Sequence, residues 1–171
     1  TERQLCDIEM ILNGGFSPLN GFLGKSDYDS VVENMRLADG ILWPMPITLD
    51  ITEEFSKEIS KGGNISLRDP EGVLIAVVNV SDIWVPDKKK ESLSVFGTTD
   101  QSHPGVNYLF NNANPVYIGG DVSGVEMPAH YDFKHFRDSP RDLREKFKRL
   151  GWRKIVAFQT RNPMHRAHVE L

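Results

Sequence analysis

The first 37 residues have two helical apolar patterns, separated by a loop that also carries apolar residues. Leu5, Ile8 and Leu12 recur at the spacing of one helix face. The pattern therefore predicts a short helix that Thr1 caps and Gly14–Gly15 end. In "GGFSPLNGFL", Gly, Pro and Asn turn the chain while Phe and Leu anchor it, which predicts a packed loop. "DYDSVVENMRL" predicts a second helix.

The middle of the chain has the patterns of short β-strands. "ILWPMPITLDI" is rich in β-formers, and its two prolines favour an edge or bulged strand. "GNISLRDPEGVLIAVVNVSDIWVP" predicts a hairpin around the turn "DPEG". "NPVYIGGDVSGVEM" predicts two short strands that Gly119–Gly120 separate, whereas "PDKKKESL" is typical of a solvated loop. Short strands with Gly/Pro turns indicate a small barrel or a strongly curved sheet.

The pattern changes again near Asp132. Ser139 is expected to cap a helix with Leu143, Phe147 and Leu150 as its apolar stripe. "KIVAFQ" then has the continuous apolar character of a parallel strand buried on both faces. Because a helix, a buried strand and a new helix open an α/β domain, we expect one domain over residues 1–132 and the start of another over 133–171.

Composition and charge narrow the function classes. The 171 residues carry a net charge of -4, which gives no electrostatic case for nucleic acid or an anionic membrane as partner. A single cysteine, Cys6, allows no disulfide within the chain and favours a reducing compartment, the cytoplasm. No apolar run approaches the roughly 20 residues of a membrane span. The first residue is Thr1 rather than Met, so we expect a segment upstream.

Polar chemistry gathers in "QTRNPMHRAH", directly after the expected strand. Ligands of open α/β sheets bind beyond the carboxyl ends of the strands. Pro163 favours Asn162 as the N-cap of a helix over residues 163–171, and a helix N-terminus suits an anion. Arg161 adds a planar fork that matches a tetrahedral oxyanion. The segment therefore predicts a site for phosphate or a similar anion.

The remaining side chains of this segment fit the same interpretation. Gln159 and Thr160 add neutral hydrogen-bonding groups, and His165 and His168 share one helix face. A simple strand end with incidental exposed side chains is an alternative. Zinc is a weaker one, because zincin histidines are four apart with Glu between them and no third ligand is near. We expect no metal held by the protein itself, and we expect the other histidines, at 103, 130 and 135, in loops.

"QTRNPMHRAH" closely resembles the nucleotide-binding motif of the ATP sulfurylase (sulfate adenylyltransferase) family. Further blocks resemble that family in the same order: "LCDIEMILNGGFSPLNGFL", "PITLDI", "HPGV", "YIGGDV" and "LGWRKIVAFQTRNPMHRAH". The resemblance implies a mixed fold, in which an N-terminal PUA-like β-barrel domain with short helices precedes the start of a Rossmann-like α/β nucleotidyltransferase domain.

The resemblance also implies an activity, in which ATP and sulfate give adenosine 5′-phosphosulfate and pyrophosphate. It implies magnesium with the ATP and no other cofactor, no nucleic-acid or membrane partner, and a homo-oligomer. By resemblance, ATP is bound by Gln159, Thr160, Arg161, Asn162, His165 and His168. All of these except Gln159 are expected to be catalytic, the two histidines by stabilising the transition state. Gln159 and Arg161 are expected to hold sulfate.

One departure from the family is large. A second nucleotide-binding segment, similar to "GRDH", is absent from the 171 residues, so we expect a fragment with half an active site. Two alternatives stay open. One is another adenylyltransferase with an "HxGH" motif, although Ala167 holds the Gly position. The other is an RNA-binding PUA-like module, against which the negative charge counts.

Overall fold

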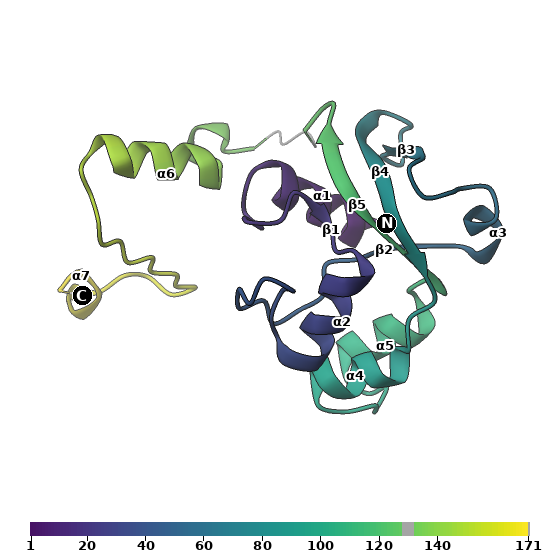
Figure 1. Ribbon diagram of the computed structural model, residues 1–171. Coiled ribbons are helices and arrows are strands. Elements are labelled where there is room, and N and C mark those ends of the chain that lie inside the picture. The colour runs from purple at the N-terminus through teal and green to yellow at the C-terminus, as the bar shows by residue number, and fades with distance from the viewer. Residues whose placement is uncertain (128–131, 171) are drawn as a thin grey trace.

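The computed structural model describes residues 1–127 and 132–170 (Figure 1). The helices are α1 (Glu2–Leu12), α2 (Lys25–Asn34), α3 (Glu53–Ser56), α4 (Lys88–Phe96), α5 (Pro104–Asn111), η1 (a 3-10 helix, Lys134–Phe136), α6 (Pro140–Arg149) and α7 (Arg166–Val169). The strands are β1 (Gly21–Phe22), β2 (Leu49–Ile51), β3 (Asn64–Arg68), β4 (Leu74–Trp84) and β5 (Val116–Gly124).

Strand β5 organises a curved antiparallel sheet. It pairs with β4 along one side and with β1 and β2 along the other, and β3 pairs with the far edge of β4. The β4–β5 register shifts between Val80 and Asp82, and such an irregularity increases the local twist. The expected small, strongly curved β domain is therefore present.

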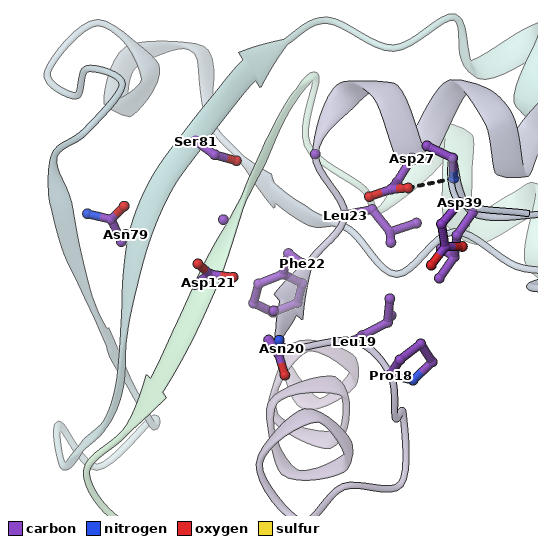
Figure 2. A pocket seen from close by; sticks show the side chains of 15 residues that line it. Pro18, Leu19, Asn20, Phe22, Leu23, Asp27, Asp39, Asn79, Ser81 and Asp121 are labelled. Carbon is purple, nitrogen blue, oxygen red and sulfur yellow. Dashed lines mark hydrogen bonds between the residues drawn. The ribbon is translucent and has the colours of Figure 1, made fainter. Parts of the chain in front are cut away.

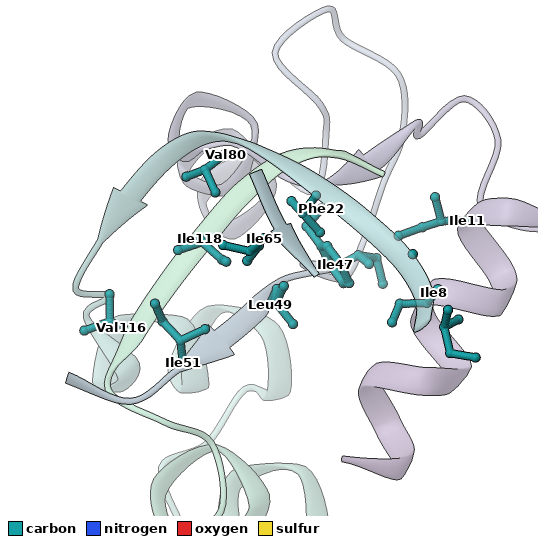
Figure 3. Close-up of a cluster of buried hydrophobic side chains, with 13 residues drawn as sticks. Ile8, Ile11, Phe22, Ile47, Leu49, Ile51, Ile65, Val80, Val116 and Ile118 are labelled. Atoms are coloured by element: carbon teal, nitrogen blue, oxygen red, sulfur yellow. The ribbon is translucent and has the colours of Figure 1, made fainter. Parts of the chain in front are cut away.

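Two apolar clusters lie against this sheet. The first is shown in Figure 3 and contains Ile8 and Ile11 of α1 together with strand residues such as Val80 and Ile118, both with no exposed surface. The second cluster packs α2 and α5 against Trp84 of β4 and Tyr117 of β5. Successive strand side chains point to opposite faces, which lets β4 and β5 contribute to both clusters.

Several local predictions are confirmed. Thr1 caps α1 in a reciprocal capping box with Gln4, and β3 and β4 form the expected hairpin. The hairpin turn is held by Asp69, whose carboxylate accepts hydrogen bonds from the backbone N–H groups of Glu71 and Val73. Ser139 caps α6, which lies beside the α1 turn, where Arg144 Nη1 donates to the Gly14 carbonyl at 3.0 Å.

The prediction of two strands around Gly119 and Gly120 is wrong, because β5 runs through both glycines. A Cβ at Gly119 would lie 2.3 Å from the Leu23 carbonyl oxygen, and one at Gly120 would lie 1.9 Å from that of Asn79. The glycines thus permit neighbouring backbone to approach β5 closely and do not interrupt the strand.

The prediction of a solvated loop at "PDKKKESL" is also wrong, because these residues begin α4. The Asp87 carboxylate accepts from the backbone N–H groups of Lys89 and Lys90, which fixes the first turn. Glu91 and Ser92 are buried, so the side of α4 that faces the protein interior carries polar residues and gives no apolar helical pattern in the sequence.

We expect Asp87→Ala to destabilise the chain by about 1 kcal/mol, because the first turn of α4 loses its cap. Urea unfolding monitored by circular dichroism measures this change. Lys89→Ala, at an exposed position of the same helix, is the matched control and should stay within about 0.5 kcal/mol of the parent. Equal stability of the two variants would contradict the capping role.

The expected buried strand at "KIVAFQ" does not form. Residues 152–160 have no regular secondary structure, and Val156 is 88% exposed. A strand buried on both faces needs neighbouring strands and covering helices, and none of the described residues supplies them here. Figure 1 shows α6 and α7 lying apart from the sheet, joined by this extended segment.

Candidate functional site

The site residues expected from the sequence all lie within residues 159–168, from the end of the extended segment into α7. Gln159, Thr160, Arg161, Asn162 and His165 are exposed to solvent. His168 is half-buried within α7. The described residues therefore present this segment openly rather than enclosing it.

Asn162 is not the helix cap that the sequence suggested. The Thr160 hydroxyl accepts from the Asn162 N–H at 3.0 Å and donates to the Asn162 carbonyl at 3.2 Å, which holds a local turn before Pro163. The helix begins only at Arg166, with His165 as its N-cap, and spans four residues. So short a helix offers little dipole to an anion, and side chains must supply most of the positive charge.

The two motif histidines do lie together. The His165 N–H donates to His168 Nδ1 at 3.3 Å, and the two ring centroids are 3.7 Å apart with planes at 30°. The centroid of the Phe158 ring also lies 5.1 Å from that of the His168 ring. Because His168 Nδ1 accepts a hydrogen bond, its Nε2 carries the proton and is the donor left for a ligand.

Arg161 has uncommitted hydrogen-bonding capacity. Its guanidinium makes no hydrogen bond or ion pair with any residue in the described ranges, and neither does the Gln159 amide. Five N–H donors of Arg161 are thus open to an oxyanion. No group of three or more His, Cys, Asp or Glu side chains that could hold a metal occurs in residues 1–127 and 132–170.

The other histidines take separate positions. His103 is the N-cap of α5, and its Nδ1 accepts from the Gly105 N–H at 3.2 Å. His135 lies in η1, with its ring 4.0 Å from that of Phe136. His130 lies outside the described residues.

A cavity of about 530 Å³ lies elsewhere, beside β1 and the start of α2 (Figure 2). Asp27, Asp39 and Asp121 line it together with backbone of the 18–24 loop. Asp27 already accepts from the Ala38 N–H, and Asp39 from the Ile41 N–H. An acidic lining repels phosphate and sulfate, so this cavity does not extend the anion site.

The sequence analysis missed a buried polar network between the sheet and the helices. Arg3 of α1 contacts Asp7 and Asp50, each at 2.6 Å. Nearby, Glu91 Oε2 accepts from the hydroxyls of Tyr28 at 2.8 Å and Tyr117 at 3.3 Å. The only sequence signal for this network is a carboxylate, Asp50, inside an otherwise apolar strand.

Burial determines the protonation behaviour of the network. It raises the pKa of Glu91, although the two tyrosine hydrogen bonds oppose the shift. Burial beside Glu91 also raises the pKa of Tyr28 and Tyr117. The pKa of Asp7 is likewise raised by burial, although the ion pair with Arg3 opposes the shift.

The raised pKa of Glu91 makes stability depend on pH. The folded chain binds this proton more tightly than the unfolded chain, so the stabilisation is complete below about pH 4.3, the usual glutamate pKa. It is lost as pH rises through the higher folded pKa of Glu91.

We therefore expect Glu91→Gln to flatten the fall in unfolding free energy as pH rises above about 4.3, measured by urea titration at a series of pH values. Glu58→Gln, at an exposed position, is the control and should keep the parental dependence. An unchanged slope in Glu91→Gln would contradict the assignment.

Comparison with known proteins identifies two parts of the chain. Residues 1–127 match the family model of the PUA-like domain. The chain belongs to the PUA-like domain family. Beyond the PUA-like domain, residues 134–171 match the family model of ATP-sulfurylase, and that match contains the whole of "QTRNPMHRAH". The resemblance that the motifs indicated is thus confirmed.

Curated relatives match both parts together. The sulfate adenylyltransferase of Eremothecium gossypii is 54% identical over all of this chain, which covers 34% of the relative. That of Saccharomyces cerevisiae is 51% identical, again over the whole chain and 33% of the relative. The chain therefore spans about a third of the length of these relatives.

The chain is also similar in fold to a solved structure. The hexameric APS kinase from Thiobacillus denitrificans superposes with a TM-score of 0.68 at 34% identity, over 98% of this chain and 29% of that one. No helix in the described part of the chain is both long and apolar enough to cross a membrane.

Proposed function

We propose that the chain is part of a sulfate adenylyltransferase, which converts ATP and sulfate into adenosine 5′-phosphosulfate and pyrophosphate. The observation that carries the proposal is that the Arg161 guanidinium, free of the other described residues, and the adjacent rings of His165 and His168 lie in one short segment inside the ATP-sulfurylase match. Relatives with that name cover the whole chain.

The chemistry fits these residue types. A sulfate oxygen attacks the α-phosphorus of ATP, the bond to the bridging oxygen breaks, and pyrophosphate leaves. Both reactants are anions, so catalysis consists of holding them together against repulsion and neutralising charge on the phosphoryl oxygens. Positive and neutral donors perform this work, and no covalent nucleophile is required.

Each residue of the segment receives a role in this proposal. Arg161 and Gln159 hold the sulfate, because both have donors free of other described residues. Thr160 and Asn162, which hydrogen bonds between them hold in one turn, contact the ATP phosphates in this proposal. His165 and His168 donate to the α-phosphoryl oxygens as charge develops there.

Magnesium enters this site with the nucleotide. Residues 159–168 contain no carboxylate, so the ATP phosphates would bind the ion, as Mg²⁺ commonly prefers. The ion would supply further neutralisation of the pyrophosphate charge. We propose no other cofactor.

The 171 residues by themselves are expected to show no turnover, because the motif is exposed and nothing described encloses ATP. The assay is sulfate-dependent release of pyrophosphate, run on this chain and on the complete protein, with sulfate omitted as the control. Turnover by the chain alone, or release by the complete protein that needs a phosphorylated organic acceptor instead of sulfate, would contradict the proposal.

RNA binding is the competing function, since PUA-like barrels of other proteins bind RNA. Affinity for RNA at two salt concentrations decides the matter, because phosphate contacts weaken steeply with salt. Saturable, salt-sensitive binding at physiological ionic strength would favour the RNA-binding function. We also propose a cytoplasmic homo-oligomer, on the free cysteine Cys6 and the hexameric relative.

A further inference from the structure

A second cavity, of about 210 Å³, lies between α1, the segment before β2, α4 and α5, away from the anion motif. Its walls are mostly apolar and include Ile47, Val95, Phe96 and Leu109. An engineered apolar cavity of about 150 Å³ holds benzene, so this one has room for a substituted benzene ring.

One buried carboxyl group opens onto this cavity. Glu91 lines it, although only 7% of the residue is exposed. Both tyrosine hydroxyls donate to Oε2, and no donor among the described residues reaches Oε1. Glu91 Oε1 therefore has no hydrogen-bond donor among the described residues, in a cavity whose mostly apolar walls also include Arg3 and Asp7.

The charges around the cavity do not balance. Asp7, Asp50 and Glu91 are three carboxyl groups, whereas Arg3 and Lys88 are the two cations beside them. Arg3 is divided between Asp7 and Asp50, and Lys88 Nζ donates to the Ala113 carbonyl at 2.6 Å. With every group ionised, the cluster lacks one positive charge. A buried carboxyl must then keep a proton or acquire a cation.

We propose that this cavity binds a small primary ammonium compound with a ring-sized apolar group. The ammonium donates to Glu91 Oε1 and supplies the missing charge, while the apolar group packs against Phe96 and Leu109. In the complex Glu91 is the carboxylate partner of the ammonium, and any proton that the carboxyl group held in the free cavity passes to solvent. Tyr28 of α2 and Tyr117 of β5 keep their hydrogen bonds to Oε2 throughout.

The probe is benzylamine, and benzyl alcohol is its neutral counterpart of the same shape. Amide chemical shifts of the isotope-labelled chain are followed during each titration at pH 7. We expect saturable shifts in α4 and α5, with benzylamine binding about tenfold or more tightly than the alcohol, because only the amine makes a charge-assisted hydrogen bond.

Three variants locate the site. Glu91→Gln keeps an acceptor for both tyrosines and should bind amine and alcohol equally. Val95→Phe fills the cavity from α4 and should abolish binding of both. Leu93→Phe places the same side chain at an exposed position of α4 that does not line the cavity, and this variant should bind as the parent does. Thermal melts establish that each variant is folded.

Several results would overturn the proposal. They are equal affinity of the parent for amine and alcohol, an amine preference that survives Glu91→Gln, and the same shifts on adding MgCl₂ alone. If Glu91→Gln does not fold, the amine–alcohol comparison and the Val95→Phe and Leu93→Phe pair still decide the outcome. None of these measurements depends on adenylyltransferase activity, so the two proposals stand or fall separately.

Discussion

His165→Ala or His168→Ala, made in the complete enzyme, lowers kcat by about 10²–10³, the usual loss for one donor at a developing oxyanion. Charge builds on the phosphoryl oxygens during transfer, so a donor placed there contributes more in the transition state than in bound ATP. ATP affinity should change far less. In the described chain, the two ring centroids lie 3.7 Å apart, so each variant also removes the ring that contacts the other histidine.

The measurement is steady-state kinetics beside ATP binding, thermal melting and metal analysis. Lys148→Ala, which removes an exposed basic side chain from α6, is the matched control and should leave kcat unchanged. Loss of ATP affinity in proportion to kcat would make the histidines ground-state anchors. Stoichiometric zinc, or collapse of the fold, would make them structural.

Arg161→Ala in the complete enzyme should reduce kcat/KM for sulfate by about 10² or more, because it removes the charged fork of the proposed sulfate site. Arg161→Lys should restore little of this, since an ammonium keeps the charge but lacks the planar pair of donors. KM for ATP should move less than KM for sulfate.

Initial rates over a matrix of ATP and sulfate concentrations test this separation. Arg149→Ala and Arg149→Lys, at an exposed arginine of α6, are the paired controls. Near-normal sulfate kinetics in Arg161→Lys would show that charge alone suffices, which is incompatible with the assigned geometry.

Local signals explain the parts of the fold that the sequence predicted. Thr1 and Gln4 lie three residues apart and form a capping box, and the "DPEG" turn between β3 and β4 needs only its own Asp69. The helix over residues 140–149 has the same kind of signal in Ser139. Interactions within four residues are visible in the sequence itself.

Long-range partners explain the errors. Helix α4 could not be predicted from its own sequence, because its buried side carries Glu91. The hydrogen-bond partners of Glu91 are on α2 and β5, 63 and 26 residues away. The apolar residues of "KIVAF" lack any described strand to pair with, so high β-propensity alone produced no strand. An apolar pattern indicates that a segment can be buried. Whether it is buried depends on the segments that pack against it.

The candidate site was predicted in its residue types and in one contact. The spacing of His165 and His168 predicted that the two side chains lie together, and their rings are in contact. His165 is however the N-cap of the short helix α7, whereas the sequence predicted a longer helix that contains both histidines. The turn at Asn162 escaped prediction, because the Thr160 hydroxyl competes for its N–H group. Side chains of this kind favour turns over helix interiors for that reason.

The position of β5 at the centre of the sheet sets the order of folding. Gly21 of β1 pairs with Asp121, 100 residues further along, and Leu49 of β2 pairs with Ile118. Neither early strand has its partner until β5 has left the ribosome, so the first half of the chain must wait, unpaired, during synthesis. Sheets with such a high contact order close slowly, and the exposed edges of β1 and β2 are open to wrong partners during that interval.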